Sequence, residues 1–244
     1  KKKNLFHKRH NNQKEVAKLI STLFMEKELK FVFLKGVPIA LEKYKTGWCR
    51  YFSDIDILMS FHSAKEGAQL LMDNGYQFGF QSQCGFSDAD FSKSIRKASK
   101  QEIYFKEVYT HELCNLIKQY ENGFMSNVDL NFEFSWQGLQ NNRANNLSFD
   151  SLYNRIVNIE CDGIDLPRFD DTIQFLHLCC HLYNEAVYFA LDIAYRGGDP
   201  KELMLFRVFD LLQFDIERIE INYLFDLCEK YKLIEKLVFS LVLV

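Results

Sequence analysis

Proline is scarce in this chain of 244 residues, which contains three of them. Because proline interrupts helices and central strands, its scarcity favours long regular elements over a modular protein with proline-rich linkers. Hydrophobic residues make up 48% and charged residues 26%, a composition too apolar for a disordered protein. The length allows one large domain or two small ones, each able to bury a core.

No sign of charge is in large excess: 30 Lys and Arg oppose 33 Asp and Glu, for a net charge of −3. The balance disfavours a protein that follows a nucleic-acid backbone through a broad basic field. A local basic segment from Lys1 to His10 leaves RNA binding open as an alternative.

The sequence also lacks paired-cysteine motifs and long apolar runs. Its seven cysteines are scattered, odd in number and without C-x-x-C spacing, which disfavours a disulfide framework and a zinc knuckle and favours free thiols in a reducing compartment. No run approaches the roughly 18 apolar residues of a membrane span. We therefore expect a cytoplasmic protein with no membrane partner.

Hydrophobic periodicity predicts an α/β first half and a helical second half. The first half is expected to contain helices over 13–30, 38–44 and 63–75, and strands over 31–34, 51–59, 76–80, 103–109 and 128–134. After residue 147 we expect helices over 172–188, 200–214, 221–231 and 233–244. The boundary is expected near residues 150–170.

The segment Ser53-Asp54-Ile55-Asp56-Ile57-Leu58 carries the clearest chemical signal. On a strand, alternate residues share a face, so Asp54 and Asp56 present two carboxylates side by side. Such carboxylates repel each other unless a cation lies between them, and oxygen ligands of this kind suit Mg²⁺. Two solvated acids at a strand edge are the simpler interpretation of D-x-D alone.

The surroundings favour the metal site. Lys35-Gly36 follows an apolar strand and precedes a helix, where backbone N–H groups and an ammonium can hold phosphate. Arg50 lies four residues before Asp54, and Asp129 is an acid on the polar face of a further strand. This combination is typical of two-metal phosphoryl or nucleotidyl transfer.

These residues resemble the nucleotidyltransferase (polymerase β-like) superfamily, and in particular a family of uncharacterised bacterial nucleotidyltransferases. The motifs that carry the resemblance are Leu34-Lys35-Gly36, Arg50-Tyr51-Phe52-Ser53-Asp54-Ile55-Asp56-Ile57-Leu58 and Val128-Asp129-Leu130-Asn131-Phe132. Segments 176–181 and 207–211 also fit, so the resemblance spans roughly residues 15–240. It implies an α/β (α+β) fold in which a mixed-sheet catalytic domain (1–160) precedes an all-helical domain (161–244).

The resemblance also implies roles for the motif residues. Asp54 and Asp56 would hold Mg²⁺ or Mn²⁺, and Asp129 would complete the second metal site and act as base toward an acceptor hydroxyl. The implied nucleotide-binding residues are Lys35, Gly36, Arg50 and Ser53. The sequence departs from the pattern at Val37, where a serine is usual, and at Asn131 and Phe132, which replace histidine and tryptophan.

The implied activity is transfer of a nucleoside monophosphate from an NTP, such as ATP, to a hydroxyl group, with release of pyrophosphate. A peptide or protein, or a small molecule, is the favoured acceptor, and an RNA 3′ end is less favoured. The alternative from another class is a non-catalytic nucleotidyltransferase-like binding module. The presence of three carboxylates favours the enzyme.

Other chemical groups have simpler interpretations. His177 and His181, one helical turn apart, suit a zinc pair less well than a polar helix edge that faces the cleft or solvent. The remaining expectations are solvated acids at Asp88, Asp90 and Glu133, and an ion pair between Arg207 and Asp210 across one helical turn.

Overall fold

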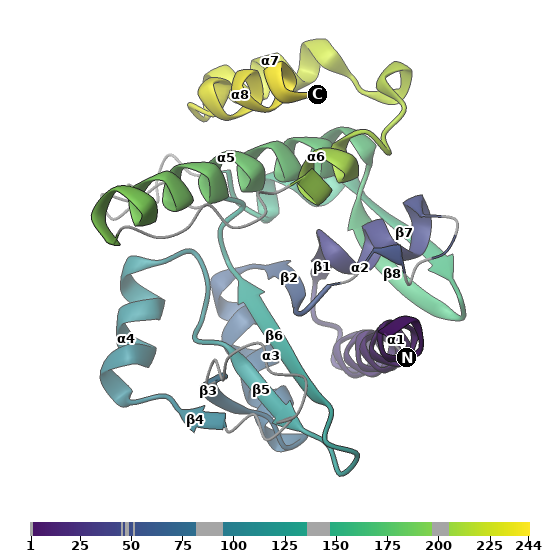
Figure 1. Cartoon of the computed structure of the whole chain (residues 1–244), viewed down its shortest axis with the longest axis vertical. Coiled ribbons are helices and arrows are strands. Elements are labelled where there is room, and N and C mark those ends of the chain that lie inside the picture. Colours follow the sequence, from purple (N-terminus) through teal and green to yellow (C-terminus); the bar gives the residue numbers. More distant parts are fainter. Residues whose placement is uncertain are drawn as a thin grey trace.

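A mixed sheet organises the first half of the protein (Figure 1). The computed structural model describes residues 2–44, 46, 49–50, 52–81, 95–135, 147–196 and 205–244. Within them, six strands pair in the order β1-β2-β6-β5-β3-β4. Their bounds are β1 (Phe31–Leu34), β2 (Ile55–Met59), β3 (Gln77–Gln81), β4 (Ile95–Lys97), β5 (Leu116–Gln119) and β6 (Met125–Asn131). The β2–β6 pair is parallel, and the other neighbours are antiparallel.

One face of this sheet packs against α1 (Lys2–Glu26) and α3 (Phe61–Asp73). The helices contribute apolar side chains such as Ile20 and Phe24, and the strands contribute alternate residues. These strand residues are Phe31, Phe33, Ile55, Ile57, Met59, Val128 and Leu130. A short helical segment, α2 (Gly36–Pro38) followed by the π-helix η1 (Ile39–Lys43), continues from β1.

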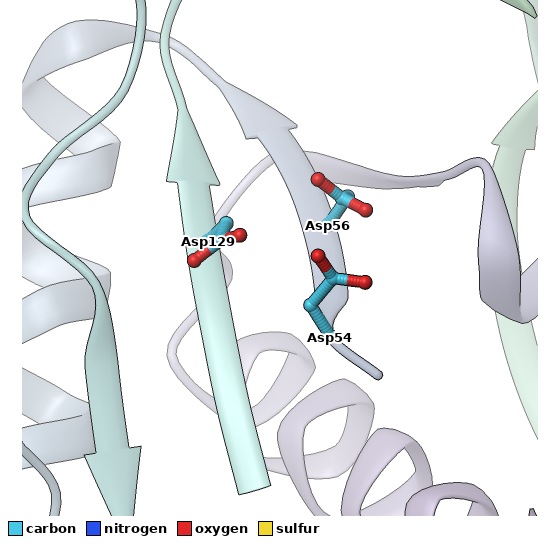
Figure 2. Close-up of side chains that lie close together, drawn as sticks. All are labelled: Asp54, Asp56 and Asp129. Atoms are coloured by element: carbon cyan, nitrogen blue, oxygen red, sulfur yellow. The ribbon is translucent and has the colours of Figure 1, made fainter. Parts of the chain in front are cut away.

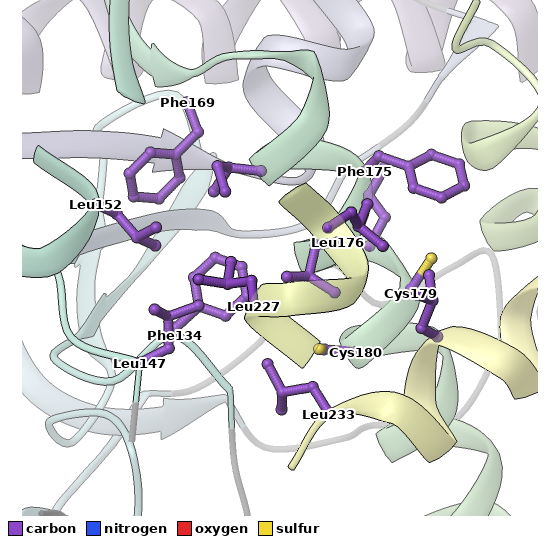
Figure 3. Packing of buried hydrophobic residues seen from close by; sticks show 14 of the residues in the cluster. Phe134, Leu147, Leu152, Phe169, Phe175, Leu176, Cys179, Cys180, Leu227 and Leu233 are labelled. Atoms are coloured by element: carbon purple, nitrogen blue, oxygen red, sulfur yellow. The ribbon is translucent and has the colours of Figure 1, made fainter. Parts of the chain in front are cut away.

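The opposite face of the sheet packs against the second half of the chain. Val32, Leu34 and Leu58 alternate with the residues of the first core and join a second one. Its helices are α5 (Asp171–Arg196), α6 (Leu205–Leu211), α7 (Ile221–Lys230) and α8 (Ile234–Leu243), with the 3₁₀ turn η5 (Ile216–Arg218). Figure 3 shows Cys179 and Cys180 of α5 packed among leucine and phenylalanine side chains of this core.

A β-hairpin lies where only helices were expected. After the 3₁₀ helix η4 (Asp150–Arg155), strands β7 (Ile156–Cys161) and β8 (Ile164–Phe169) pair antiparallel. The turn residues Asp162 and Gly163 both have positive φ, 54° and 73°, and Asp-Gly is a strong hairpin signal. The expectation of helix alone after residue 147 is therefore wrong.

The expected strand over 103–109 is also wrong, because this segment belongs to α4 (Lys100–Tyr109). Ser99 and Glu102 form a capping box at its start, a helix signal stronger than the β-prone Ile, Tyr, Phe and Val side chains that follow. Helix α3 likewise begins earlier than expected, because Ser60 and not Ser63 caps it. The other expected elements are present in the described residues, with shifted ends.

The α/β fold class with a mixed sheet and helices toward the C-terminus is confirmed. The two domains proposed above, 1–160 and 161–244, remain a prediction, and the β7–β8 hairpin spans their boundary. Among the described helices, none has the length and hydrophobicity needed to cross a bilayer.

Candidate active site

Three aspartates meet on the face of the sheet that carries the second core. Figure 2 shows Asp54 just before β2, Asp56 on β2 and Asp129 on the neighbouring β6. The parallel register places Asp56 directly opposite Asp129, so the two side chains leave the sheet on the same face. One carboxylate oxygen from each aspartate lies within 4.8 Å of the others. Within the described residues, no other group of His, Cys, Asp and Glu brings three possible metal ligands together.

Burial makes this cluster electrostatically costly without a cation. Burial and the charge of Asp54 raise the pKa of Asp56 to about 6, although Lys35 opposes the shift. Burial and the charges of Glu112, Asp54 and Asp56 raise the pKa of Asp129 well above its ordinary value. A divalent cation held by the three carboxylates would relieve this repulsion, so the residues present fit Mg²⁺ or Mn²⁺.

The loop before β2 is held by the N-terminal helix and by close packing. Gln13 of α1 donates a hydrogen bond of 2.9 Å to the carbonyl oxygen of Ser53, and the Ser53 hydroxyl lies 3.3 Å from Asp54 Oδ1. A Cβ atom at Gly36 would lie 2.6 Å from the Cβ of Phe52, so glycine is needed there for packing. The expected contacts of Ser53 and Gly36 with a nucleotide stay predictions.

Lys35 supplies a positive charge directly at the acids. Its Nζ lies 2.6 Å from Asp56 Oδ1. Burial alone would lower the pKa of Lys35, but its attraction to Asp56 and Asp54 outweighs burial and raises it. The backbone φ of Lys35 is +45°, a conformation that a residue with a Cβ adopts rarely, at the point where β1 passes into α2. Lys35 is therefore a charged residue of the site in the nucleotide-free protein.

Arg50 is buried and makes a bidentate ion pair with Asp210 of α6. Its Nε and Nη2 donate to the two carboxylate oxygens at 2.7 and 2.6 Å, and the Tyr44 hydroxyl donates to the same carboxylate at 2.9 Å. The expected pair between Arg207 and Asp210 is wrong, because Arg50 takes Asp210 and Arg207 bonds to Glu185. The role of Arg50 toward a nucleotide stays a prediction.

The structure adds residues that were not expected in the site. Asn115 donates a hydrogen bond of 2.5 Å to Asp129 Oδ1, and Glu112 lies close enough to raise the pKa of Asp129. Glu112 is ion-paired with Lys106 of α4. These residues come from the connection between α4 and β5, which no motif marks in the sequence. The capping signal at Ser99 and Glu102 would have placed α4, but not its distance from Asp129.

Glu133, His177 and His181 also lie in the described part of the chain. Glu133 is buried, so its expected place as a solvated acid is wrong. His177 packs edge-on against Phe134, with ring centroids 5.2 Å apart, and His181 Nε2 lies 3.0 Å from Glu185 Oε1. Burial and then the charge of Lys35 lower the pKa of both histidines, that of His181 to about 3. They are neutral side chains near Lys35. Asp88 and Asp90 lie outside the described residues.

Comparison with known proteins gives a match over almost the whole chain. The family model described as uncharacterised nucleotidyltransferase matches residues 2–244. No curated protein matches. Two similar solved structures are a Thermotoga maritima protein provisionally described as a nucleotidyltransferase and an antigenic nucleotidyltransferase-like protein from Paracoccidioides brasiliensis. The first is 13% identical and covers 77% of this chain and 92% of its own; the second is 11% identical and covers 82% and 73%. Both have a TM-score of 0.43.

Proposed function

Because this chain belongs to the uncharacterised nucleotidyltransferase family, we propose that it is a metal-dependent nucleotidyltransferase. It moves a nucleoside monophosphate from an NTP to a hydroxyl group of an acceptor and releases pyrophosphate. The observation that carries the proposal is the cluster of Asp54, Asp56 and Asp129, each of which places one carboxylate oxygen within 4.8 Å of the others.

The three aspartates would hold the divalent metal, Mg²⁺ or Mn²⁺, at two neighbouring sites. When bound, the metal supplies positive charge to the phosphates and makes the acceptor hydroxyl more acidic. Asp54 is partly exposed and can meet an incoming metal–nucleotide complex, whereas Asp56 and Asp129 are buried and preorganised by the β2–β6 pairing. Relief of their mutual repulsion favours metal binding.

The nucleotide would bind on the β1 side of the aspartates. Lys35, with its Nζ 2.6 Å from Asp56, lies where it can contact a triphosphate oxygen. Ser53, whose hydroxyl lies beside Asp54, and the backbone at Gly36 would approach the phosphates in the same place. Arg50, held by Asp210, would add positive charge behind the loop.

The acceptor would bind on the β5 side, next to Asp129. The acceptor oxygen forms a new bond to the α-phosphorus, the bond from that phosphorus to the pyrophosphate oxygen breaks, and the hydroxyl proton passes to Asp129 Oδ2. Asn115 occupies Oδ1 and fixes the orientation of this carboxylate. A carboxylate oxygen within hydrogen-bond reach of the acceptor hydroxyl is a suitable proton acceptor.

We favour a peptide, a protein or a small molecule as the acceptor over an RNA 3′ end. The chain has a net charge of −3, and binding along an RNA backbone depends on neutralising many phosphates. Transfer to an RNA 3′ end that is faster than to any peptide or small hydroxylated molecule would overturn this preference.

The test is pyrophosphate release from ATP, CTP, GTP and UTP with Mg²⁺ or Mn²⁺, in the wild type and in Asp54→Asn and Asp56→Asn. We expect each variant to lose at least about a hundredfold in rate because an aligned metal ligand is lost, with an unchanged circular dichroism spectrum. Asp226→Asn, at an exposed acid on α7, is the matched control and should keep wild-type activity. Wild-type rates in both site variants would contradict the proposal.

The rival function is that of a binding module that holds a nucleotide without reacting. It predicts NTP binding with no pyrophosphate release, even when the acceptor is present. Two buried acids with raised pKa values beside a third acid favour catalysis, because a module that only binds has no need of them.

A further inference from the structure

Arg207 of α6 is fixed in place by an acid on another helix. Its Nε and Nη2 donate to the two carboxylate oxygens of Glu185 on α5, at 2.9 and 2.7 Å. His181 lies 3.0 Å from the same carboxylate. These partners outweigh burial and hold the pKa of Glu185 below its ordinary value, so Glu185 is ionised at neutral pH. This bidentate contact with Glu185 fixes the orientation of the guanidinium plane of Arg207.

This arrangement leaves part of the guanidinium group available. Both contacts with Glu185 use Nε and Nη2, and within the described residues Arg207 Nη1 has no protein acceptor. The Arg207 side chain is 18% exposed, against 5% for the Arg50 side chain. Arg207 therefore combines a fixed position with free donors and access to solvent.

Arg207 lies beside Arg50, one of the residues expected to bind the nucleotide. The Cζ of Arg207 lies 4.5 Å from the centre of the Phe206 ring, and the Cζ of Arg50 lies 4.9 Å from the same ring. Both arginines therefore flank one residue of α6. The charge of Arg207 also opposes the rise in the pKa of Lys35, whose Nζ lies 2.6 Å from Asp56. In the order of the strands, Lys35 adjoins β1, whereas Asn115 and Glu112 lie near β5, beyond Asp129.

The charges already at the site show why a further cation is needed. Lys35 is paired with Asp56, and Arg50 is paired with Asp210. An NTP brings about four negative charges, and phosphate oxygens are bound best by guanidinium groups with correctly directed N–H donors. Arg207 can donate from Nη1 to a phosphate while its Nε and Nη2 stay bonded to Glu185.

We propose that Arg207 is a further nucleotide-binding residue, which donates from Nη1 to the triphosphate, and that Glu185 is its positioning residue. This inference rests on the proposed function, because it assigns the partner of the same site. It gives the helical half of the chain a direct part in substrate binding.

The test is the affinity for α,β-methylene-ATP, which is not cleaved at the α-phosphorus, and for AMP, measured calorimetrically with Mg²⁺. For Arg207→Ala we expect the Kd of the triphosphate analogue to rise about tenfold or more, as for loss of one charged hydrogen bond, with the Kd of AMP nearly unchanged. For Glu185→Gln we expect a smaller rise, since the arginine is present but less well held. Arg218→Ala, an exposed arginine, is the matched control and should bind as the wild type does.

Arg207→Lys keeps the charge beside Glu185 and so tests the proposal where the alanine variant does not fold. The affinity of Arg207→Lys for the triphosphate analogue should fall while its affinity for AMP stays nearly the same, because lysine lacks the planar guanidinium group and its paired N–H donors. Unchanged triphosphate affinity in Arg207→Ala and Arg207→Lys, with a wild type that binds, would overturn the inference and leave the proposed function standing. A wild type that binds neither α,β-methylene-ATP nor the corresponding analogues of CTP, GTP and UTP would overturn both the inference and the proposed function.

Discussion

Asp56 and Asp129 are buried acids, and their energetic effect depends on pH. Both have raised pKa values in the folded protein, so each keeps its proton at a pH where it would lose it in the unfolded chain. Over that interval, unfolding releases protons, and these two groups make the free energy of unfolding fall as the pH rises. For Asp56 the interval runs from its ordinary value of 3.8 to about 6, and for Asp129 it extends further.

Asp129→Asn should therefore stabilise the metal-free protein. The amide keeps the hydrogen bond from Asn115 and removes a buried charge next to Asp56. The gain over wild type should grow as the pH rises above about 4 and reach about 1–2 kcal/mol near pH 8, the usual size of a gain at a site strained for function. Urea denaturation in the presence of a chelator, at several pH values, measures it.

The buried histidines have lowered pKa values, so their titration makes the free energy of unfolding rise with pH. This contribution is common to the wild type and Asp129→Asn, and it cancels in the difference between them. Adding Mn²⁺ is the control: it should raise the melting temperature of the wild type more than that of the variant. A stability difference that is constant from pH 4 to pH 8 would contradict the assignment of Asp129 as a costly buried acid.

At the scale of elements, a buried ion pair connects the sheet half of the chain with the helices of the second half. Arg50 lies between η1 and β2, and Asp210 lies on α6, 160 residues later. Both residues are buried, and Tyr44 completes the contact. The pair places α6 beside the loop that leads to Asp54, so the position of Arg207 depends on it.

Asp210→Ala should cost about 3–5 kcal/mol of stability, because it removes the carboxylate that neutralises the buried Arg50 guanidinium. The matched control is Arg218→Ala, which removes an exposed ion pair with Asp215 and should cost less than about 0.5 kcal/mol. Equilibrium denaturation in urea measures both. Equal losses in the free energy of unfolding would show that the buried ion pair contributes no more to stability than the exposed one.

At the scale of the whole molecule, the sheet separates two cores and takes part in both. On β2, Ile57 packs against α1 and α3, and its neighbour Leu58 packs against the helices of the second half. The β7–β8 hairpin joins them too, since Leu166 belongs to the first core and Phe169 to the second. The sheet and the hairpin therefore contribute side chains to both cores.

Ile57→Ala and Leu58→Ala should each cost about 2–5 kcal/mol, because both side chains are fully buried. In each variant we expect one cooperative transition, seen at the same denaturant concentration by circular dichroism and by tryptophan fluorescence. Two separated transitions, with Ile57→Ala shifting only one of them and Leu58→Ala only the other, would show instead that the halves unfold independently.

Much of the site could be predicted from local patterns, because the physics involved is local. The period of two along a strand places Asp54 and Asp56 together and directs Ile55 and Ile57 into the core. The same rule puts Asp129 on the polar side of its own strand. A capping box likewise marks α4, and Asp-Gly marks the β7–β8 turn, although these signals compete with β-prone side chains and with the helical character of the second half.

Only the tertiary structure decides which distant groups meet. The parallel pairing of β2 with β6 sets Asp129 opposite Asp56, and the packing of α6 gives Asp210 to Arg50 and Glu185 to Arg207. A charged side chain pairs with the opposite charge that folding brings close to it and shields from water. The spacing of residues along one helix does not reveal which partner that is. The sequence by itself thus determined the fold class and the acids that can hold a metal. The partners of Arg50 and Arg207, and the positions of Asn115 and Glu112 beside Asp129, were decided by packing between elements far apart in the chain.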